Sequence, residues 1–131
     1  MAFAIIDTNL LIRFFIGDDP IKATKVKELL STNRDKVLLL DVVVAECVWV
    51  LSSFYKLSPE EIEDMLVAVI ESESVVTNKQ ALRLAFDIWI KENIEFIDAY
   101  EIAMATEVGV DVIYSYDKKL AKASEIKVLE P

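Results

Sequence analysis

Histidine is absent from the 131 residues, and cysteine occurs once, at Cys47. The missing histidine excludes Ser–His and Cys–His catalytic arrangements, histidine general bases and histidine-containing zinc sites. A single cysteine excludes an intrachain disulfide, and this usage leads us to expect a cytoplasmic protein. Any catalysis must therefore depend on carboxylates, hydroxyls and cations.

Glycine and long apolar runs are also scarce. The chain has two glycines, and no segment approaches the roughly 18 uninterrupted apolar residues that a membrane-spanning helix needs. Repeats, linkers and low-complexity segments are missing, so the length predicts one domain over residues 1–131. The hydrophobic fraction of 54% favours a well-packed core together with an apolar surface for a partner.

Basic residues are fewer than acidic ones: 14 Lys and Arg face 23 Asp and Glu, which gives a net charge of −9. A chain of this charge repels nucleic acid as a whole. Any contact with RNA must then be local, bridged by a metal ion, or made with the help of a partner.

Hydrophobic periodicity predicts short strands that alternate with amphipathic helices. The expected strands cover residues 3–6, 37–40, 75–76, 112–114 and 127–129. Helices are expected from about residue 10 and over residues 21–30, 42–55, 59–72, 82–90 and 99–108, with a short one after residue 117. Ser58 and Pro59 have the residue types of a helix start, and Gly109 that of a helix end. This alternation predicts a single α/β unit.

Glu46 is the only carboxylate in the apolar segment 42–51. If it is buried, it must be protonated, paired with a cation or bound to a metal ion, because an isolated buried charge is costly. The alternative is that Glu46 lies on a face of its helix that reaches solvent.

Three other acids stand where a strand ends or a helix begins. Asp7 and Asp117 each follow an expected strand, and Asp98 stands at the start of a helix. Each alone is explained as a helix cap or a first-turn acid.

Together, the four acids predict a metal site. In a parallel sheet the carboxyl ends of the strands and the starts of the next helices share one edge, where ligand sites form. Carboxylates gathered there repel one another unless a divalent cation lies among them, and Mg²⁺ prefers oxygen ligands. We expect one or two Mg²⁺ or Mn²⁺ ions at Asp7, Glu46, Asp98 and Asp117, which would allow metal-assisted hydrolysis of a phosphodiester.

Polar and basic neighbours of the acids fit the same site. Thr8, Asn9 and Ser115 are candidates to hydrogen-bond the carboxylates or metal-bound waters, although capping and turn formation explain them equally well. Candidates for contacts with phosphate are Arg13, Lys118 and Lys119, and a solvated charged face is the alternative for the lysines.

Four segments together resemble the PIN-domain ribonucleases, and within them the VapC-type toxins of prokaryotic toxin–antitoxin pairs. The segments occur in the family's order and span nearly the whole chain: residues 5–11, 43–51, 96–99 and 114–120. The resemblance implies a three-layer α/β/α fold with a short central parallel sheet of four or five strands and about seven helices.

The resemblance also implies an activity and partners. These are endonucleolytic cleavage of RNA with Mg²⁺ or Mn²⁺ at the four acids, a homodimer, and a cognate antitoxin protein. One departure bears on the number of metal ions: many relatives carry a further acid two residues after the last Asp, where this chain has Lys119.

Other function classes are weaker. A haloacid dehalogenase-type phosphotransferase needs a second Asp where Asn9 stands, and the acid pattern of a receiver domain is missing. The serious alternative is a catalytically silent PIN-like module that binds proteins.

An apolar helical stripe is a candidate for self-association, together with the helix around Trp49 and Phe54. The stripe consists of Leu82, Ala85, Phe86, Trp89 and Ile90. The alternative is that these side chains complete the core.

Overall fold

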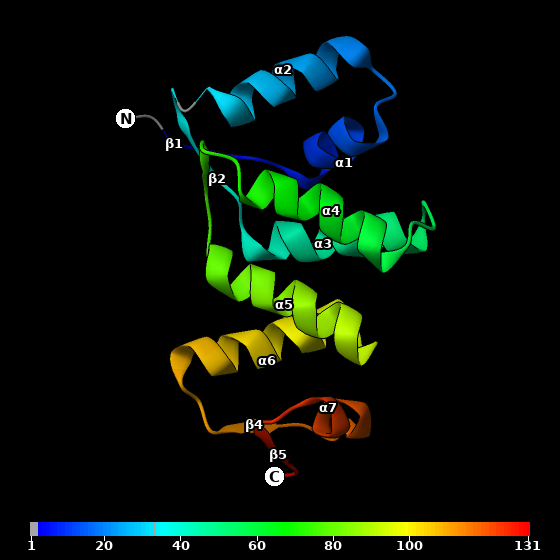
Figure 1. Cartoon of the computed structure of the whole chain (residues 1–131), viewed down its shortest axis with the longest axis vertical. Helices are drawn as coiled ribbons and strands as arrows, with labels where there is room; N and C mark the ends of the chain where they lie inside the picture. Colours follow the sequence, from blue (N-terminus) through cyan, green and yellow to red (C-terminus); the bar gives the residue numbers. More distant parts are fainter. Residues whose placement is uncertain (1–2, 33) are drawn as a thin grey trace. The chain divides into compact units, whose positions relative to one another are not determined.

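The computed structural model describes residues 3–32 and 34–131, and this part of the chain contains seven helices and five strands (Figure 1). The chain divides into two compact units, Met1–Lys79 and Gln80–Pro131. In Figure 1 the first unit runs from blue to green and the second from yellow-green to red. Each unit is described by itself.

The first unit contains a parallel sheet of three short strands in the order β1-β2-β3. These are β1 (Phe3–Ile5), β2 (Lys36–Leu38) and β3 (Val75–Val76). Ala4 is opposite Val37, which in turn is opposite Val75. Because parallel neighbours need long crossover connections, two helices follow each of the first two strands.

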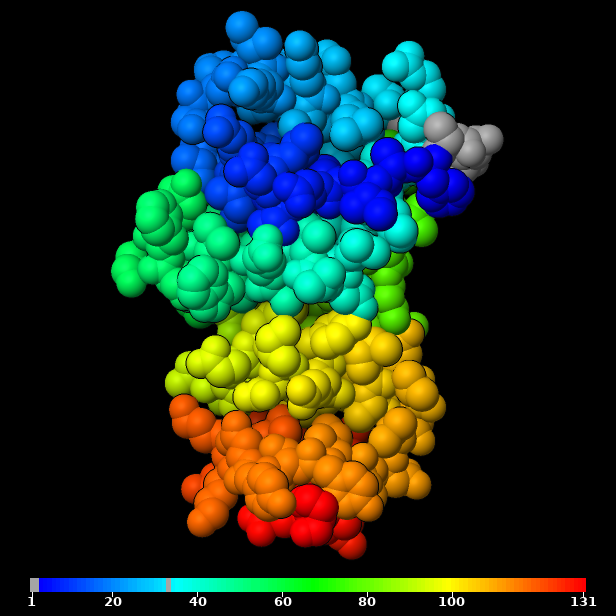
Figure 2. Space-filling model, turned by 180° about the vertical axis from the view of Figure 1, so that it is seen from behind, coloured from blue at the N-terminus to red at the C-terminus, as the bar shows by residue number. Residues whose placement is uncertain are grey.

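The helices of the first unit are α1 (Thr8–Ile16), α2 (Pro20–Ser31), α3 (Asp41–Ser53) and α4 (Pro59–Ile70). α1 contacts both α2 and α3, and α3 also contacts α4. From behind, the blue surface of α1 lies between those of α2 and α3 (Figure 2). The helices bury Leu11, Val44, Leu51, Leu66 and Ile70.

Helix ends follow the local chemistry of the sequence. Ser58 and Glu61 form a reciprocal capping box, in which the Ser58 hydroxyl accepts from the Glu61 N–H and Glu61 Oε1 accepts from the Ser58 N–H, both at 3.2 Å. Gly109 ends α6 (Phe96–Val108) in the left-handed conformation with φ of 80°. The expected helix start at Ser58 and the expected stop at Gly109 are both confirmed.

The second unit contains α5 (Lys79–Glu92) from its second residue onward, and α6. These are followed by β4 (Val112–Tyr114), α7 (Lys118–Ala123) and β5 (Lys127–Leu129). β4 and β5 pair in parallel, with Ile113 opposite Val128. α7 connects the two strands and contacts β5.

The apolar stripe of α5 belongs to the core. Leu82, Ala85 and Phe86 are fully buried and Trp89 is buried as well. Ring centroids lie 4.8 Å apart for Phe86 and Phe96, and 5.7 Å apart for Trp89 and Phe96. Part of the surface formed by this stripe and the helix around Trp49 and Phe54 was expected to serve self-association. These stripe side chains pack inside the chain, as the alternative had it, whereas Trp49 and Phe54 are exposed.

The α/β class, the parallel strands and the seven helices are confirmed. The five strands form one sheet of three strands and one of two, whereas a single central sheet of four or five was expected. Within the part of the chain that the structure describes, no helix has the length and apolar character needed to cross a membrane.

Candidate active site

Asp7 follows β1 and caps the N-terminus of α1. Its carboxylate Oδ2 accepts a hydrogen bond from the backbone N–H of Asn9 at 3.3 Å, and the residue is exposed. Thr8, the first residue of α1, is buried. The capping role expected for Asp7 is therefore present, and the carboxylate still faces solvent.

Glu46 is exposed on α3, so the alternative that its helix face reaches solvent is the correct one, and the carboxylate is not buried. The core side of α3 consists of Val43, Val44, Cys47, Val48 and Leu51. Glu46 lies on the other side of the helix, with the exposed side chains of Val42 and Trp49. Because α3 is apolar on nearly every side, its sequence does not reveal which face is buried.

Asp7 and Glu46 both act electrostatically on the buried thiol of Cys47. The pKa of the buried Cys47 thiol is raised to about 12, mainly by burial and then by the negative charges of Glu46 and Asp7. Two acids far apart in the sequence thus raise the pKa of the same thiol, and the helices α1 and α3 contact each other. Both acids belong to the first unit, and each lies within electrostatic reach of the Cys47 thiol.

Asp98 and Asp117 form the corresponding pair in the second unit. Asp98 is half-buried in the first turn of α6, and burial raises the pKa of its carboxyl, with further contributions from the charges of Asp117 and then Glu95. A carboxylate that feels a second carboxylate binds its proton more tightly.

Asp117 is held at the N-terminus of α7 by several hydrogen bonds. Its Oδ1 accepts from the backbone N–H of Lys119 at 2.8 Å and of Leu120 at 3.3 Å. The Ser115 hydroxyl accepts from the Asp117 N–H at 3.0 Å. Ser115 therefore shapes the turn that carries Asp117, which is one of the two roles expected for it.

Glu101 joins this second pair, although it was not among the site residues predicted from the sequence. The pKa of its carboxyl is raised by burial, then by the charge of Asp98 and then by that of Asp117. Glu101 follows Asp98 by three residues on α6, a spacing that places two side chains on the same helix face. That spacing is the signal that identifies Glu101 from sequence.

The predicted phosphate contacts are also exposed. Lys118 and Lys119 stand in the first turn of α7, directly after Asp117. Arg13 lies on α1, where it lines a cavity together with Asn9.

The chemistry of the donors fits a hard divalent cation. All the candidate ligands are carboxylates, which suit Mg²⁺ or Mn²⁺ better than a metal that prefers nitrogen or sulfur. Among residues 3–32 and 34–131, no group of three or more Asp, Glu, Cys or His side chains is close enough to hold a metal ion. Each unit by itself contains two of the four predicted acids: Asp7 and Glu46 in the first, Asp98 and Asp117 in the second.

Comparison with known proteins places the chain in a family. The PIN domain matches residues 4–126, a stretch that includes residues of both units. A VapC ribonuclease of Aquifex aeolicus (strain VF5) is 25% identical over 121 residues, which cover 90% of this chain and 90% of that protein. Since the PIN domain match extends over nearly the whole sequence, the chain belongs to the PIN domain family.

Proposed function

We propose that this PIN domain protein is a metal-dependent endoribonuclease and the toxin of a type II toxin–antitoxin pair. The observation that carries the proposal is that the predicted acids share electrostatic surroundings: Asp7 and Glu46 both act on the Cys47 thiol, and Asp117 acts on the carboxyl of Asp98. The similarity to a VapC ribonuclease supports the same activity. A single domain over residues 1–131 is part of the proposal.

In this proposal Asp7, Glu46, Asp98 and Asp117 hold one or two Mg²⁺ or Mn²⁺ ions. Such an ion activates water and neutralises charge on the phosphate being cleaved. The Asn9 N–H orients the carboxylate of Asp7. The N–H groups at the start of α7 do the same for Asp117 and leave its Oδ2 free of these bonds.

Substitution of single acids tests the activity. Asp7→Asn and Asp98→Asn should each lower the rate of RNA cleavage roughly 100-fold or more, because a lost metal contact weakens both binding and activity. Asp87→Asn, at an exposed aspartate of α5, is the matched control and should cleave like the wild type. The measurement is the initial cleavage rate of a generic RNA in buffer with defined Mg²⁺ or Mn²⁺. Wild-type cleavage by either site variant removes that residue from the site.

A catalytically silent protein-binding module is the second candidate, and the net charge of −9 favours it. Mn²⁺ affinity measured together with RNA cleavage separates the two candidates. Mn²⁺ binding with cleavage supports the nuclease, whereas an inert protein that binds no metal supports the module.

The partners in this proposal are a second copy of the chain and an antitoxin. We expect the antitoxin to present apolar anchors and a basic side chain that reaches the carboxylates and displaces metal. The product of the neighbouring gene should then slow cleavage, and more Mn²⁺ should restore it. The proposal includes a cytoplasmic location.

A further inference from the structure

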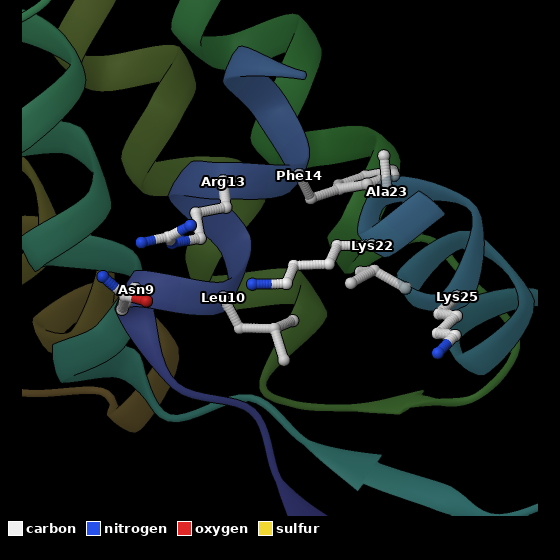
Figure 3. A pocket seen from close by; sticks show the side chains of 8 residues that line it. Asn9, Leu10, Arg13, Phe14, Lys22, Ala23 and Lys25 are labelled. Carbon is white, nitrogen blue, oxygen red and sulfur yellow. The ribbon is translucent and has the colours of Figure 1, made fainter. Parts of the chain in front are cut away.

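A cavity of about 430 Å³ lies between α1 and α2 in the first unit (Figure 3). This size falls within the range of about 300–1,000 Å³ that is usual for ligand pockets. Its polar lining consists of Arg13, Lys22, Lys25 and the amide of Asn9, and no acidic residue lines it. In a chain with a net charge of −9, three cations around one cavity form a local site for an anion.

These cations are largely free to bind a ligand. Within residues 3–32 and 34–131, neither the Arg13 guanidinium nor the Lys25 ammonium has a hydrogen-bond or ion-pair partner. The Lys22 ammonium lies 4.0 Å from Asp19 Oδ2, and its side chain is 64% exposed. Such a long, solvated ion pair is weak. Asp19 also accepts the Lys22 backbone N–H at 3.1 Å as the cap of α2, so its carboxylate already has a structural role.

The side chains also give the cavity a polar side and an apolar wall. In Figure 3 the Arg13 guanidinium and the Lys22 ammonium point toward the side where Asn9 lies, whereas Lys25 points away from them. Leu10 and Phe14 contribute apolar surface from α1. A phosphate beside Arg13 and Lys22 would leave a sugar or base against Leu10 and Phe14, and both parts of a nucleotide would be accommodated.

The cavity begins beside a proposed metal ligand. Asn9, which lines it, donates its backbone N–H to Asp7. Arg13 lies six residues beyond Asp7, which is about 9 Å along the helix at 1.5 Å per residue. An RNA strand held at Asp7 therefore reaches the cavity with its neighbouring nucleotides.

We propose that this cavity is a nucleotide-binding subsite for single-stranded RNA, in which Arg13 and Lys22 bind a phosphate that flanks the cleaved one. Asn9 contributes a hydrogen bond, and the apolar wall of Leu10 and Phe14 holds the sugar or base. The inference rests on the proposed ribonuclease function and explains how a strongly acidic chain holds an anionic strand. Lys25, at the outer edge, has a smaller part.

RNA affinity without cleavage tests the subsite. A fluorescein-labelled single-stranded RNA is titrated with the full chain in EDTA, and the dissociation constant is measured by anisotropy at several salt concentrations. The double variant Arg13→Gln/Lys22→Gln should bind about tenfold more weakly. The slope of the logarithm of affinity against the logarithm of salt concentration should become shallower by roughly 0.7, since Arg13 and Lys22 bind the same phosphate and each phosphate contact contributes about 0.7.

Two controls keep the result specific. Lys91→Gln removes one charge from an exposed lysine of α5 and should leave the dissociation constant and its salt dependence unchanged. Arg13→Lys keeps the charge and should retain most of the salt dependence. Circular dichroism checks that every variant is folded. In Mn²⁺, cleavage by the double variant should show a higher KM with a nearly unchanged kcat.

Amide shifts in NMR spectra localise the binding. A single-stranded RNA trinucleotide should shift the amide signals of Asn9, Arg13 and Lys22.

Two results overturn the subsite: an RNA affinity and salt dependence that are unchanged in the double variant, or amide shifts only outside α1 and α2. Shifts caused by a Glu-rich peptide and not by RNA also overturn it and assign the cavity to a protein partner. A wild type that never cleaves RNA, but whose RNA affinity falls in the double variant, refutes the ribonuclease function and supports the subsite.

Discussion

At the scale of single residues, capping a helix and binding a metal ion are compatible roles for one carboxylate. A carboxylate offers about four acceptor positions. Asp7 uses Oδ2 for the Asn9 N–H, and Asp117 uses Oδ1 for two N–H groups. The remaining positions are available to a cation, so the two explanations that the sequence leaves open for these acids do not compete.

Glu101 gives a prediction for pH dependence. Its pKa is raised above the ordinary glutamate value of 4.5 by burial, Asp98 and Asp117, so the folded chain binds this proton more tightly than the unfolded chain. The free energy of unfolding therefore falls as the pH rises from 4.5 through the raised pKa. Glu101→Gln removes this loss and should therefore raise the melting temperature of the metal-free protein at pH 7. The increase should be a few degrees at most, because an exposed carboxylate contributes little to stability.

The measurement is thermal unfolding in EDTA from pH 4 to pH 8, followed by circular dichroism. Glu125→Gln, at an exposed glutamate of the same unit, is the control and should follow the wild type. The advantage of Glu101→Gln should shrink toward pH 4. An advantage that does not change with pH would mean that Glu101 acts through packing and not through its charge.

At the scale of elements, the sequence predicts helix starts and ends that are determined by neighbouring residues. The capping box at Ser58 and the stop at Gly109 depend on residues next to each other in the chain, and the structure contains both. The orientation of α3 depends on tertiary packing, because its sequence is apolar around almost the whole helix. This is why the exposure of Glu46 could not be predicted, although its place on a helix could.

The exposed face of α3 gives a prediction about self-association. Val42 and Trp49 are 67% and 66% exposed, and Phe54, just after the helix, is 74% exposed. With the stripe of α5 buried, this face is where we expect the proposed homodimer to form. Trp49→Ser should shift the protein toward monomer with little loss of stability, because Trp49 buries little surface within the chain.

Light scattering after size exclusion, at tens of micromolar protein (an order-of-magnitude choice for a moderate-affinity dimer), measures the mass. Tyr114→Ser removes an equally exposed aromatic side chain from β4 and should leave the mass unchanged. A wild type that is monomeric at this concentration rules out the dimer. A dimer that persists in Trp49→Ser places the interface elsewhere.

At the scale of the whole molecule, sequence predicted the α/β class and all five strands but not how the strands are divided between sheets. Strands of two or three residues carry too few side chains to specify a partner, so pairing depends on tertiary contacts. The arrangement of the four acids likewise depends on tertiary contacts. Their positions on elements follow from local patterns, whereas the pairs they form depend on how α1 meets α3 and how the start of α7 approaches α6.

The proposed metal site makes a prediction that involves both units, because its ligands come from both. Trp49 belongs to the first unit and Trp89 to the second, so Trp49→Phe leaves one tryptophan as a reporter on the second unit. Mg²⁺ at 100 times its dissociation constant should stabilise the folded chain by about 2.7 kcal/mol, and Trp89 fluorescence should report a higher unfolding midpoint.

In the Trp49→Phe protein, Glu46→Gln should reduce this Mg²⁺-induced increase in the unfolding midpoint, although Glu46 lies in the first unit. Without metal, Glu46→Gln should be neutral or stabilising, since it removes one negative charge from the acids of the proposed site. Glu28→Gln, at an exposed glutamate of α2, is the control and should keep the full increase. Equal Mg²⁺-induced shifts with Glu46 and with Gln at that position would exclude Glu46 as a ligand, because a residue that binds the ion must contribute to the stabilisation that the ion produces.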